Sequence, residues 1–208
     1  MYAAHGLALP DTPVMALHRG RIDLLAAHLE RDPDLLHRTF RHREIYPAEM
    51  GCREPLDATV GTPLDGTTLL HMCVEYDELE IARWLIAQGA DVNARAAIGP
   101  NGFGGYTPLF NAVVSQPNFW MNYRTRGPFT APFAELLLEH GADPNARASI
   151  WKQLHPGHGD PARPDYRDVT PLAWGRRFHA PVFVSEPAMR LIEQAGLFAD
   201  RLSINLEL

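Results

Sequence analysis

The side chains best suited to chemistry lie in one short segment, residues 151–160, which reads WKQLHPGHGD. Its His155, His158 and Asp160 are of the types that bind zinc. However, the proline and glycine between the two histidines do not form the helical face on which zinc proteases present their ligands, and neither a cysteine nor a fourth ligand is near. We interpret the segment as a polar, turn-rich loop, and we expect no metal site and no cofactor in this chain.

Motifs for nucleophilic and phosphate chemistry are absent from the sequence. It holds no Gly-x-Ser-x-Gly elbow, and the glycine-rich segment 99–105 is neither preceded by a strand pattern nor followed by Lys-Ser or Lys-Thr. We therefore recognise no catalytic motif, and we interpret these glycines as a wide turn. An active site assembled from scattered side chains stays an open alternative, and its candidates are Glu75, Arg124, Tyr166, His155, His158 and Asp160.

Internal repetition indicates which elements would position these residues. Residues 65–95 read DGTTLLHMCVEYDELEIARWLIAQGADVNAR, and a second copy opens with Thr-Pro-Leu at 107–109 and closes with GADPNAR at 141–147. A third copy opens with Thr-Pro-Leu at 170–172, and a less regular one at 15–29 leads the chain. A recurrence near ~33 residues with these letters resembles the ankyrin repeat, in which each unit contributes a β-turn and two antiparallel helices.

The resemblance implies an all-α fold, namely an ankyrin-repeat solenoid with β-turn fingers and irregular inserted loops. We predict one domain over residues 1–208 with about four repeats. The repeats at the two ends are degenerate, as expected where no neighbour covers the outer face. The predicted repeats are 11–36, 65–95, 105–147 with an insertion at 115–130, and 168–200, and the predicted insertions between them are 37–64, 96–104 and 148–167.

The residue types at several positions of the repeat can be explained physically. Thr107 followed by Pro108 starts a helix, because threonine caps free N–H groups and proline has its φ already set. Gly89 and Gly141 follow apolar runs where a left-handed residue ends a helix, a conformation that costs other side chains about 1 kcal/mol. Cys73 lies at a small core position of the best repeat, so we expect a buried thiol and no disulfide framework.

Composition limits the classes of function. The 208 residues are 46% apolar, enough for one continuous core, yet no stretch approaches the ~18 uncharged apolar residues of a membrane span. No secretory signal is visible, so we expect a cytoplasmic protein without membrane contact. The formal net charge of −6, with no long basic run, argues against a nucleic-acid surface and fits a neutral or basic protein partner better.

The insertions are the main departure from a regular array. Long loops in compact domains are usually functional or disordered, and the aromatic content of 37–64 favours an ordered loop packed across the array. Segment 115–130 concentrates Trp120, Tyr123 and Arg124, which are residue types that dominate binding hot spots. The alternative is that its aromatic rings only fasten the loop to the adjacent repeat.

The resemblance to ankyrin repeats implies that a partner would contact the fingertips and the last residues of the inner helices. Together with the segment 115–130, these positions give the predicted partner- or ligand-binding residues: Glu75, Tyr76, Phe103, Tyr106, Trp120, Tyr123, Arg124, Tyr166, Arg167, Arg177 and Phe178. An exposed aromatic row of this kind would be adhesive on a monomer. We therefore expect a partner, a ligand or the protein's own insertions to cover it.

Two functional hypotheses follow. The first is an intracellular protein–protein interaction module that binds a partner through the concave surface of its fingers and inner helices. The alternative is a small-molecule-binding protein or enzyme whose pocket is formed by the insertions over that face, because an ordinary binding array does not need so many inserted residues. Self-association through the aromatic row is a further option.

Overall fold

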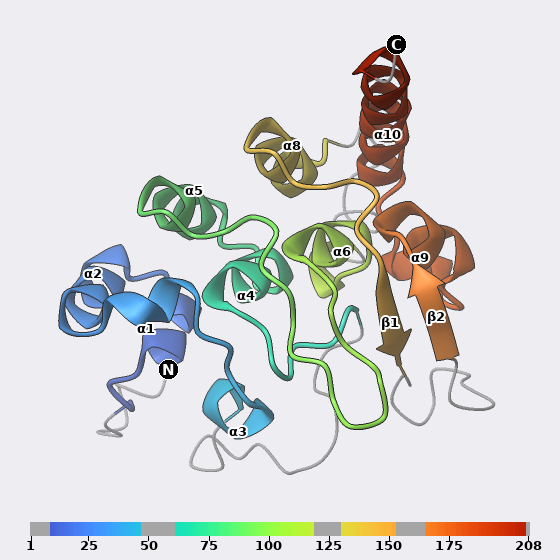
Figure 1. Cartoon of the computed structure of the whole chain (residues 1–208). Coiled ribbons are helices and arrows are strands. Elements are labelled where there is room, and N and C mark those ends of the chain that lie inside the picture. The colour runs from blue at the N-terminus through green and yellow to red at the C-terminus, as the bar shows by residue number, and fades with distance from the viewer. Residues whose placement is uncertain (1–8, 47–60, 119–129, 153–164, 207–208) are drawn as a thin grey trace.

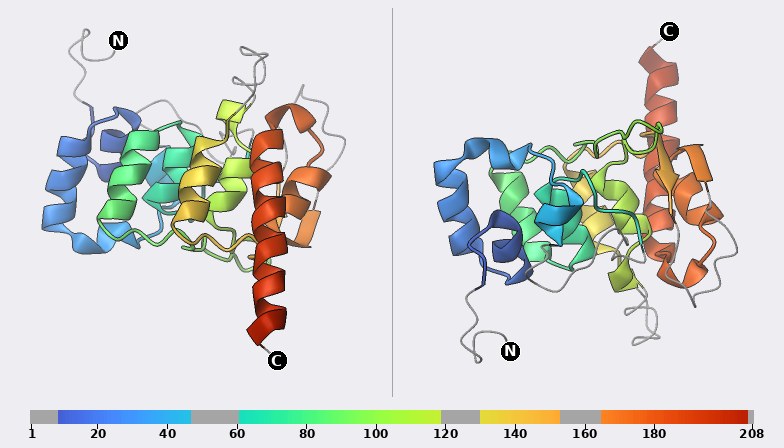
Figure 2. Two further views of the ribbon diagram at one scale, coloured as in Figure 1. Left: turned by 90° about the horizontal axis from the view of Figure 1, so that it is seen from above. Right: turned by 90° about the horizontal axis from the view of Figure 1, so that it is seen from below.

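Paired helices make up most of the computed structural model, which describes residues 9–46, 61–118, 130–152 and 165–206, with side chains as far as Leu197. Four helix pairs stand side by side in the described residues (Figure 1). The pairs are α1 (Pro13–His18) with α2 (Ile22–Arg31), α4 (Leu69–Glu75) with α5 (Leu79–Ala87), α6 (Pro108–Val113) with α8 (Pro132–Glu139), and α9 (Pro171–Arg177) with α10 (Glu186–Leu206). The first helices of the pairs form an inner row and the second helices an outer row, and α10 extends beyond the others (Figure 2). The predicted all-α solenoid is confirmed.

The outer helices end as the repeated letters predict, and the inner helices begin as predicted only in part. At Thr107 α6 begins where expected, but the predicted side-chain cap is wrong, because Oγ1 of Thr107 is buried and makes no hydrogen bond to a described residue. Oγ1 of Thr12 and Oγ1 of Thr170 each accept a hydrogen bond from the N–H three residues further on, at 3.1 and 3.2 Å. Gly89 and Gly141 follow α5 and α8 with φ angles of 100° and 85°. Only glycine adopts such angles freely, so these two positions end the outer helices at little cost.

One cluster of buried apolar side chains runs through all four pairs. Cys73 of α4 and Trp174 of α9 are fully buried within it. The buried thiol predicted for Cys73 is confirmed, and burial raises its pKa above the ordinary value. No helix among the described residues is both long and apolar enough to cross a membrane.

Hydrogen bonds between main chains join the fingers into a row. The N–H of Phe40 donates to the carbonyl of Thr67 at 2.8 Å, and the N–H of Ala97 donates to the carbonyl of Gly66 at 2.7 Å. Asn93, near the end of its repeat, adds a side-chain link, because its Nδ2 donates to the carbonyl of Gly141 one repeat further along, at 2.9 Å. Each finger is therefore held by its neighbours rather than by its own turn alone.

The last finger is an antiparallel two-stranded sheet, formed by β1 (Ala148–Trp151) and β2 (Asp165–Val169). Gly104 of the preceding finger pairs with Ser149, so the sheet continues the row. The segment 148–167, which the sequence predicts to be irregular, thus contains β1 and the start of β2. This correction has a physical reason: Ala148 and Ile150 are buried, and pairing satisfies the main-chain groups between them.

The insertion between the first two repeats lies across the inner helices. After the 3₁₀ turn η2 (Pro33–Leu36) it forms the short helix α3 (His42–Ile45), and it returns at residues 61–64. The N–H of Thr62 donates to the carbonyl of Val114, at the end of α6, at 3.0 Å. The prediction of an ordered loop packed across the array is confirmed for these parts of the insertion. A second 3₁₀ turn, η4 (Pro181–Phe183), joins α9 to α10.

Candidate functional site

A cavity of about 660 Å³ opens between α3 and the fingers. Its lining comes from all three regions that the sequence marks as insertions between repeats, and from the fingers that they extend. The lining residues are Arg41, His42, Arg43, Pro63, Asp65, Ala97, Ile98, Gly99, Pro100, Asn101, Phe103, Gly104, Tyr106, Ile150 and Trp151. We call this space the finger-side cavity.

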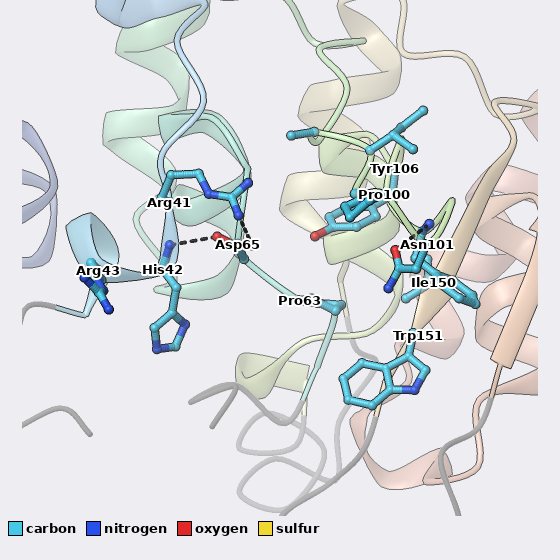
Figure 3. Close-up of a pocket in the computed structure, with 15 residues that line it drawn as sticks. Arg41, His42, Arg43, Pro63, Asp65, Pro100, Asn101, Tyr106, Ile150 and Trp151 are labelled. Atoms are coloured by element: carbon cyan, nitrogen blue, oxygen red, sulfur yellow. Dashed lines mark hydrogen bonds and ion pairs between the residues drawn. The ribbon is translucent and has the colours of Figure 1, made fainter. Parts of the chain in front are cut away.

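The two sides of the finger-side cavity differ in chemistry (Figure 3). Arg41, His42 and Asp65 lie on one side, which is polar and charged, and we call it the polar wall. Tyr106 and Ile150 lie on the other side, which is formed by the finger 97–106 and β1 and is mostly apolar. We call this second side the apolar wall.

Asp65 organises the polar wall. Its Oδ1 accepts a hydrogen bond from the main-chain N–H of His42 at 2.8 Å, and its Oδ2 lies 3.2 Å from a guanidinium nitrogen of Arg41. Arg41 in turn opens α3, where its own N–H donates to a carboxylate oxygen of Glu44 at 2.8 Å. The short helix therefore presents its basic residues in a fixed frame, although it is only one turn long.

Tyr106 forms the inner end of the apolar wall, and its main chain is fixed by the repeat. Its carbonyl accepts a hydrogen bond from Nε2 of His71 at 3.1 Å and from the N–H of Ala96 at 2.8 Å. Ile98 stands at the opening, where 68% of its surface is exposed. Phe103 lies at the rim, with the guanidinium carbon of Arg167 4.4 Å from the centre of its ring.

His71 supports this end of the cavity as a neutral imidazole. Nδ1 accepts a hydrogen bond from the N–H of Thr68 at 3.3 Å, which leaves the proton on Nε2 for the bond to Tyr106. Burial lowers the pKa of His71 to about 4, since a charged ring would be desolvated there. The Thr-x-x-His spacing at Thr68 and His71 thus serves the architecture of the array.

Three aromatic residues that the sequence places in an exposed row are buried instead. Tyr106, Tyr166 and Phe178 each retain only 4% exposure. Tyr166 packs edge-on against Trp174 at a ring distance of 4.7 Å, and its hydroxyl oxygen lies 2.6 Å from Nδ1 of His179. The protein itself covers these rings, which is one of the covers expected for the row. Tyr106 lies against the rings of His71 and Phe110. Tyr166 and Phe178 lie against Trp174.

The predicted residues at the end of α4 hold the insertions. Glu75 is buried, and its Oε1 accepts a hydrogen bond from the N–H of Gln116 at 3.1 Å. Tyr76 is half-buried, and its hydroxyl lies 3.0 Å from the hydroxyl of Tyr46 at the end of α3. These two residues therefore connect the array to two insertions and contribute nothing to the lining of the finger-side cavity.

The remaining predicted residues fall into two groups. Arg167 and Arg177 are exposed, the first beside Phe103 and the second with its guanidinium 5.9 Å from the ring centre of Tyr166. The others lie outside the described residues, namely Trp120, Tyr123, Arg124, His155, His158 and Asp160. Within the described residues, no three metal-binding side chains come together.

The sequence did not single out Arg41, Ile98 or Trp151, which the structure places around the finger-side cavity. Each lies inside a region identified as an insertion, and Trp151 is also the first residue of the segment 151–160 noted for its polar side chains. No motif marks the individual positions, because the cavity forms only when segments far apart in sequence fold together.

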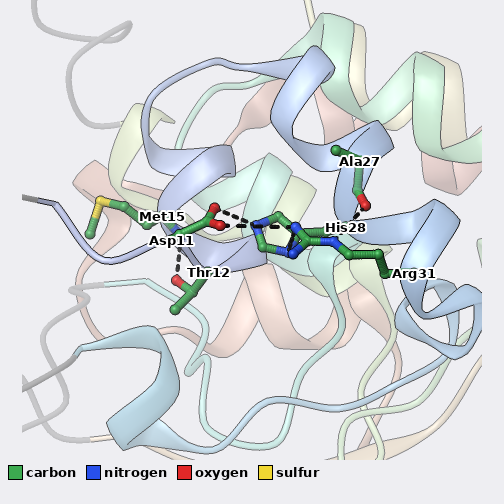
Figure 4. A network of polar contacts seen from close by, with 6 residues as sticks. All are labelled: Asp11, Thr12, Met15, Ala27, His28 and Arg31. Atoms are coloured by element: carbon green, nitrogen blue, oxygen red, sulfur yellow. Dashed lines mark hydrogen bonds and ion pairs between the residues drawn. The ribbon is translucent and has the colours of Figure 1, made fainter.

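A second polar cluster, at the N-terminal end of the array, is structural (Figure 4). Nε2 of His28 lies 3.0 Å from a carboxylate oxygen of Asp11, and a guanidinium nitrogen of Arg31 lies 3.1 Å from its Nδ1. Arg31 also donates to the carbonyl of Ala27 at 2.9 Å. The cluster fastens α2 to the segment before α1, and its residues do not line the finger-side cavity.

Comparison with known proteins gives one family. The family described as ankyrin repeats, in a model of three copies, matches residues 15–148. The fold is similar to an ankyrin repeat domain from Acinetobacter baumannii, at 22% identity and a TM-score of 0.48, over 88% of this chain and 63% of that one. It is also similar to the ankyrin repeat domain of Bcl-3, a member of the IκB protein family, at 17% identity and a TM-score of 0.44, over 87% of this chain and 50% of that one. This chain thus spans less than two thirds of either structure. No curated protein sequence matches it.

Proposed function

The chain belongs to the ankyrin repeat family, whose members generally mediate protein–protein interactions, and on this premise we propose that it binds a protein partner through the finger-side cavity and its rim. The observation that carries the proposal is that residues from separate insertions line the same cavity. Arg41, Ile98 and Trp151 come from three separate insertions, and all three line one cavity. Ordinary packing between repeats does not need such an arrangement.

The surface chemistry fits a contact with another protein. Aromatic and arginine side chains are enriched in binding hot spots, and Phe103, Trp151, Arg41 and Arg167 are of these types. Ile98 leaves a large apolar side chain exposed at the opening, which a partner would cover. A rigid frame of linked fingers lowers the entropy cost of binding, since little has to be ordered when the partner arrives.

Affinity capture with matched variants tests this proposal. We would compare the wild-type chain with Ile98→Asp and with Leu197→Asp. Both replaced residues have aliphatic side chains that are exposed, at 68% and 59%, and Leu197 lies on α10, away from the lining of the cavity. The expected result is a stoichiometric protein retained by the wild type and by Leu197→Asp and lost with Ile98→Asp. A partner that all three chains retain equally would place the binding surface elsewhere.

A second function is favoured by the size of the cavity. Its volume of about 660 Å³ lies within the range of ~300–1,000 Å³ that small-molecule sites occupy. A pocket for a small molecule would agree with the alternative hypothesis from the sequence. A thermal-shift screen of metabolites separates the two functions: a small molecule that stabilises the wild type but not Ile98→Asp, with no protein captured by either, would favour the small-molecule function.

A further inference from the structure

We propose that the finger-side cavity binds an extended segment of the partner in which acidic side chains alternate with apolar ones. This inference rests on the protein-binding function proposed above and specifies the chemistry of the partner. It follows from the two walls of the cavity, which differ in charge and polarity and face each other (Figure 3).

The charge of the lining selects an anionic group. Arg41 and Arg43 line the cavity, and Asp65 is the one acidic side chain among its described lining residues. Both oxygens of Asp65 already contact the protein, through the N–H of His42 and the guanidinium of Arg41. Among the described lining residues, two arginines therefore accompany one carboxylate, although the whole chain carries −6. The charge of these described side chains is opposite in sign to the charge of the molecule, and it attracts anionic groups.

Arg41 can contact a carboxylate of the partner at low cost. Its ion pair with Asp65 is exposed to solvent, with 67% of the Arg41 side chain accessible. Exposed pairs of this kind contribute little to stability, because water and salt screen them. Because a guanidinium has several donors in a planar fork, Arg41 can keep one contact to Asp65 while it binds a second carboxylate.

The apolar wall requires a different side chain. Ile98, Phe103 and Tyr106 line this side, and Ile98 is one of the few large apolar side chains that are exposed among the described residues. An acidic group against these side chains would lose its hydration without a partner charge. An aliphatic or aromatic side chain is therefore favoured here, at the same time as a carboxylate is favoured at Arg41.

An extended segment satisfies both walls at once. Side chains of an extended chain point alternately to opposite sides, with a period of two residues. A segment that lies between the walls would direct one set of side chains to the arginines and the other set to Ile98 and Phe103. Strand-like binding with pockets for alternate side chains is a recurrent way to recognise peptides. We infer a polypeptide rather than a free acid, because Ile98 lies at the opening and needs cover beyond the cavity itself.

Synthetic peptides of stated composition test the inference by fluorescence anisotropy. The first probe alternates Glu with Leu, the second replaces every Glu with Gln, and the third keeps the composition of the first but places all Glu residues before all Leu residues. The expected result is at least tenfold tighter binding of the first probe than of the other two, with an affinity that falls as salt is raised. Equal binding of all three probes, or no binding of any, would overturn the inference.

Variants of Arg41 show whether the contact is direct. We expect Arg41→Gln to weaken binding of the Glu–Leu probe at least tenfold, and Arg41→Glu to bind a Lys–Leu probe more tightly than the Glu–Leu probe. A structural role of Arg41 would not reverse the preference in this way. The control is Arg83→Glu, since Arg83 is an exposed arginine of α5 whose side chain also pairs with a carboxylate; its preference should equal that of the wild type.

The outcomes separate this inference from the function on which it rests. If Ile98→Asp abolishes capture of the partner but the three probes bind alike, the cavity binds a protein and the inferred chemistry is wrong. If Ile98→Asp leaves capture unchanged and no probe binds, both are wrong. Displacement of the Glu–Leu probe by free N-acetylglutamate at equal concentration would show a site for a small acid and would overturn the inference of a peptide.

Discussion

The indole Nε1 of Trp174 donates a hydrogen bond to Oγ1 of Thr62 at 3.0 Å, across 112 positions of sequence. The same hydroxyl lies 2.9 Å from the carbonyl oxygen of Val114 and 3.2 Å from that of Phe110. One threonine at the end of the first insertion thus joins α6 to α9, and all of these contacts are buried. The insertion is part of the folded array, and these buried hydrogen bonds fix the position of a segment next to the cavity.

Replacing Thr62 by valine should destabilise the protein. Valine keeps the shape but leaves the Trp174 N–H buried without its acceptor, which costs about 1–3 kcal/mol. Urea unfolding of Thr62→Val, Trp174→Phe and the double variant would measure the coupling between the two residues. We expect the double variant to be less destabilised than the sum of the single ones, and strict additivity would contradict the linkage.

Glycine is required at position 61 for a steric reason. A Cβ atom there would lie 2.5 Å from Cα of Ser115 and 2.9 Å from the carbonyl oxygen of Val114, both main-chain atoms that cannot move aside freely. We therefore expect Gly61→Ala to lower the free energy of unfolding by about 1–3 kcal/mol, as overpacking does.

The control for position 61 is Gly196→Ala in α10. There the nearest atom to a new Cβ is Oδ1 of Asn145 at 3.6 Å, an ordinary contact. Since alanine is favoured over glycine inside a helix, this variant should gain about 0.5–1 kcal/mol. Equal effects of the two substitutions in thermal or urea unfolding would show that the segment at residue 61 is not packed against α6 as described.

Stability should fall between pH 7 and pH 5 because of His71. The pKa of His71 in the folded protein is lowered to about 4, whereas that of an unfolded histidine is about 6.5. The unfolded state therefore binds a proton first as the pH falls through 6.5, and the contribution of His71 is present above this value and is lost toward pH 4. For these two pKa values the loss is about 2 kcal/mol between pH 7 and pH 5.

The test of the His71 prediction is the slope of stability with pH. His71→Gln cannot take up a proton, so its unfolding free energy should change less between pH 7 and pH 5 than that of the wild type. Because the comparison uses the change of the unfolding free energy with pH, any constant loss of stability caused by the substitution cancels. Identical slopes would show that another group dominates this pH range.

The sequence was sufficient to predict those features of the fold that depend on residues close together in the chain. Thr170 begins a helix, Gly89 and Gly141 end helices, and Cys73 is buried, because caps, turns and small core positions are local requirements. Repetition of these letters then fixes how the pairs stack, since each unit must bury the same face against the next.

The candidate site could not be predicted in the same way. Tyr166 occupies a fingertip position, yet its burial depends on Trp174 and on the turn that brings His179 to its hydroxyl. Arg41 and Ile98 belong to no motif, and they come to one cavity only because the fingers are linked by main-chain bonds across repeats. Insertions escape the repeat pattern, so the repeat predicts neither their path nor their contacts.

The rim of the cavity gives the last prediction. Phe103 is half-buried, and the guanidinium of Arg167 covers its ring at 4.4 Å. Because part of the ring is already in solvent, Phe103→Ala should lower the unfolding free energy by only about 1 kcal/mol. If the rim contacts the partner, the same change should weaken binding of the captured protein at least tenfold, which corresponds to about 1.4 kcal/mol.

Calorimetric titration of the captured partner would separate the contribution of the Phe103 ring to affinity from that of the Arg167 guanidinium. Arg167→Gln removes the cation above Phe103 but leaves the ring in place, so we expect a smaller loss of affinity than for Phe103→Ala, and a loss that depends more on salt. Leu197→Ala serves as the control, since its side chain is also exposed but lies on α10. Unchanged affinity of Phe103→Ala would exclude the rim from the interface and confine the contact to the interior of the cavity.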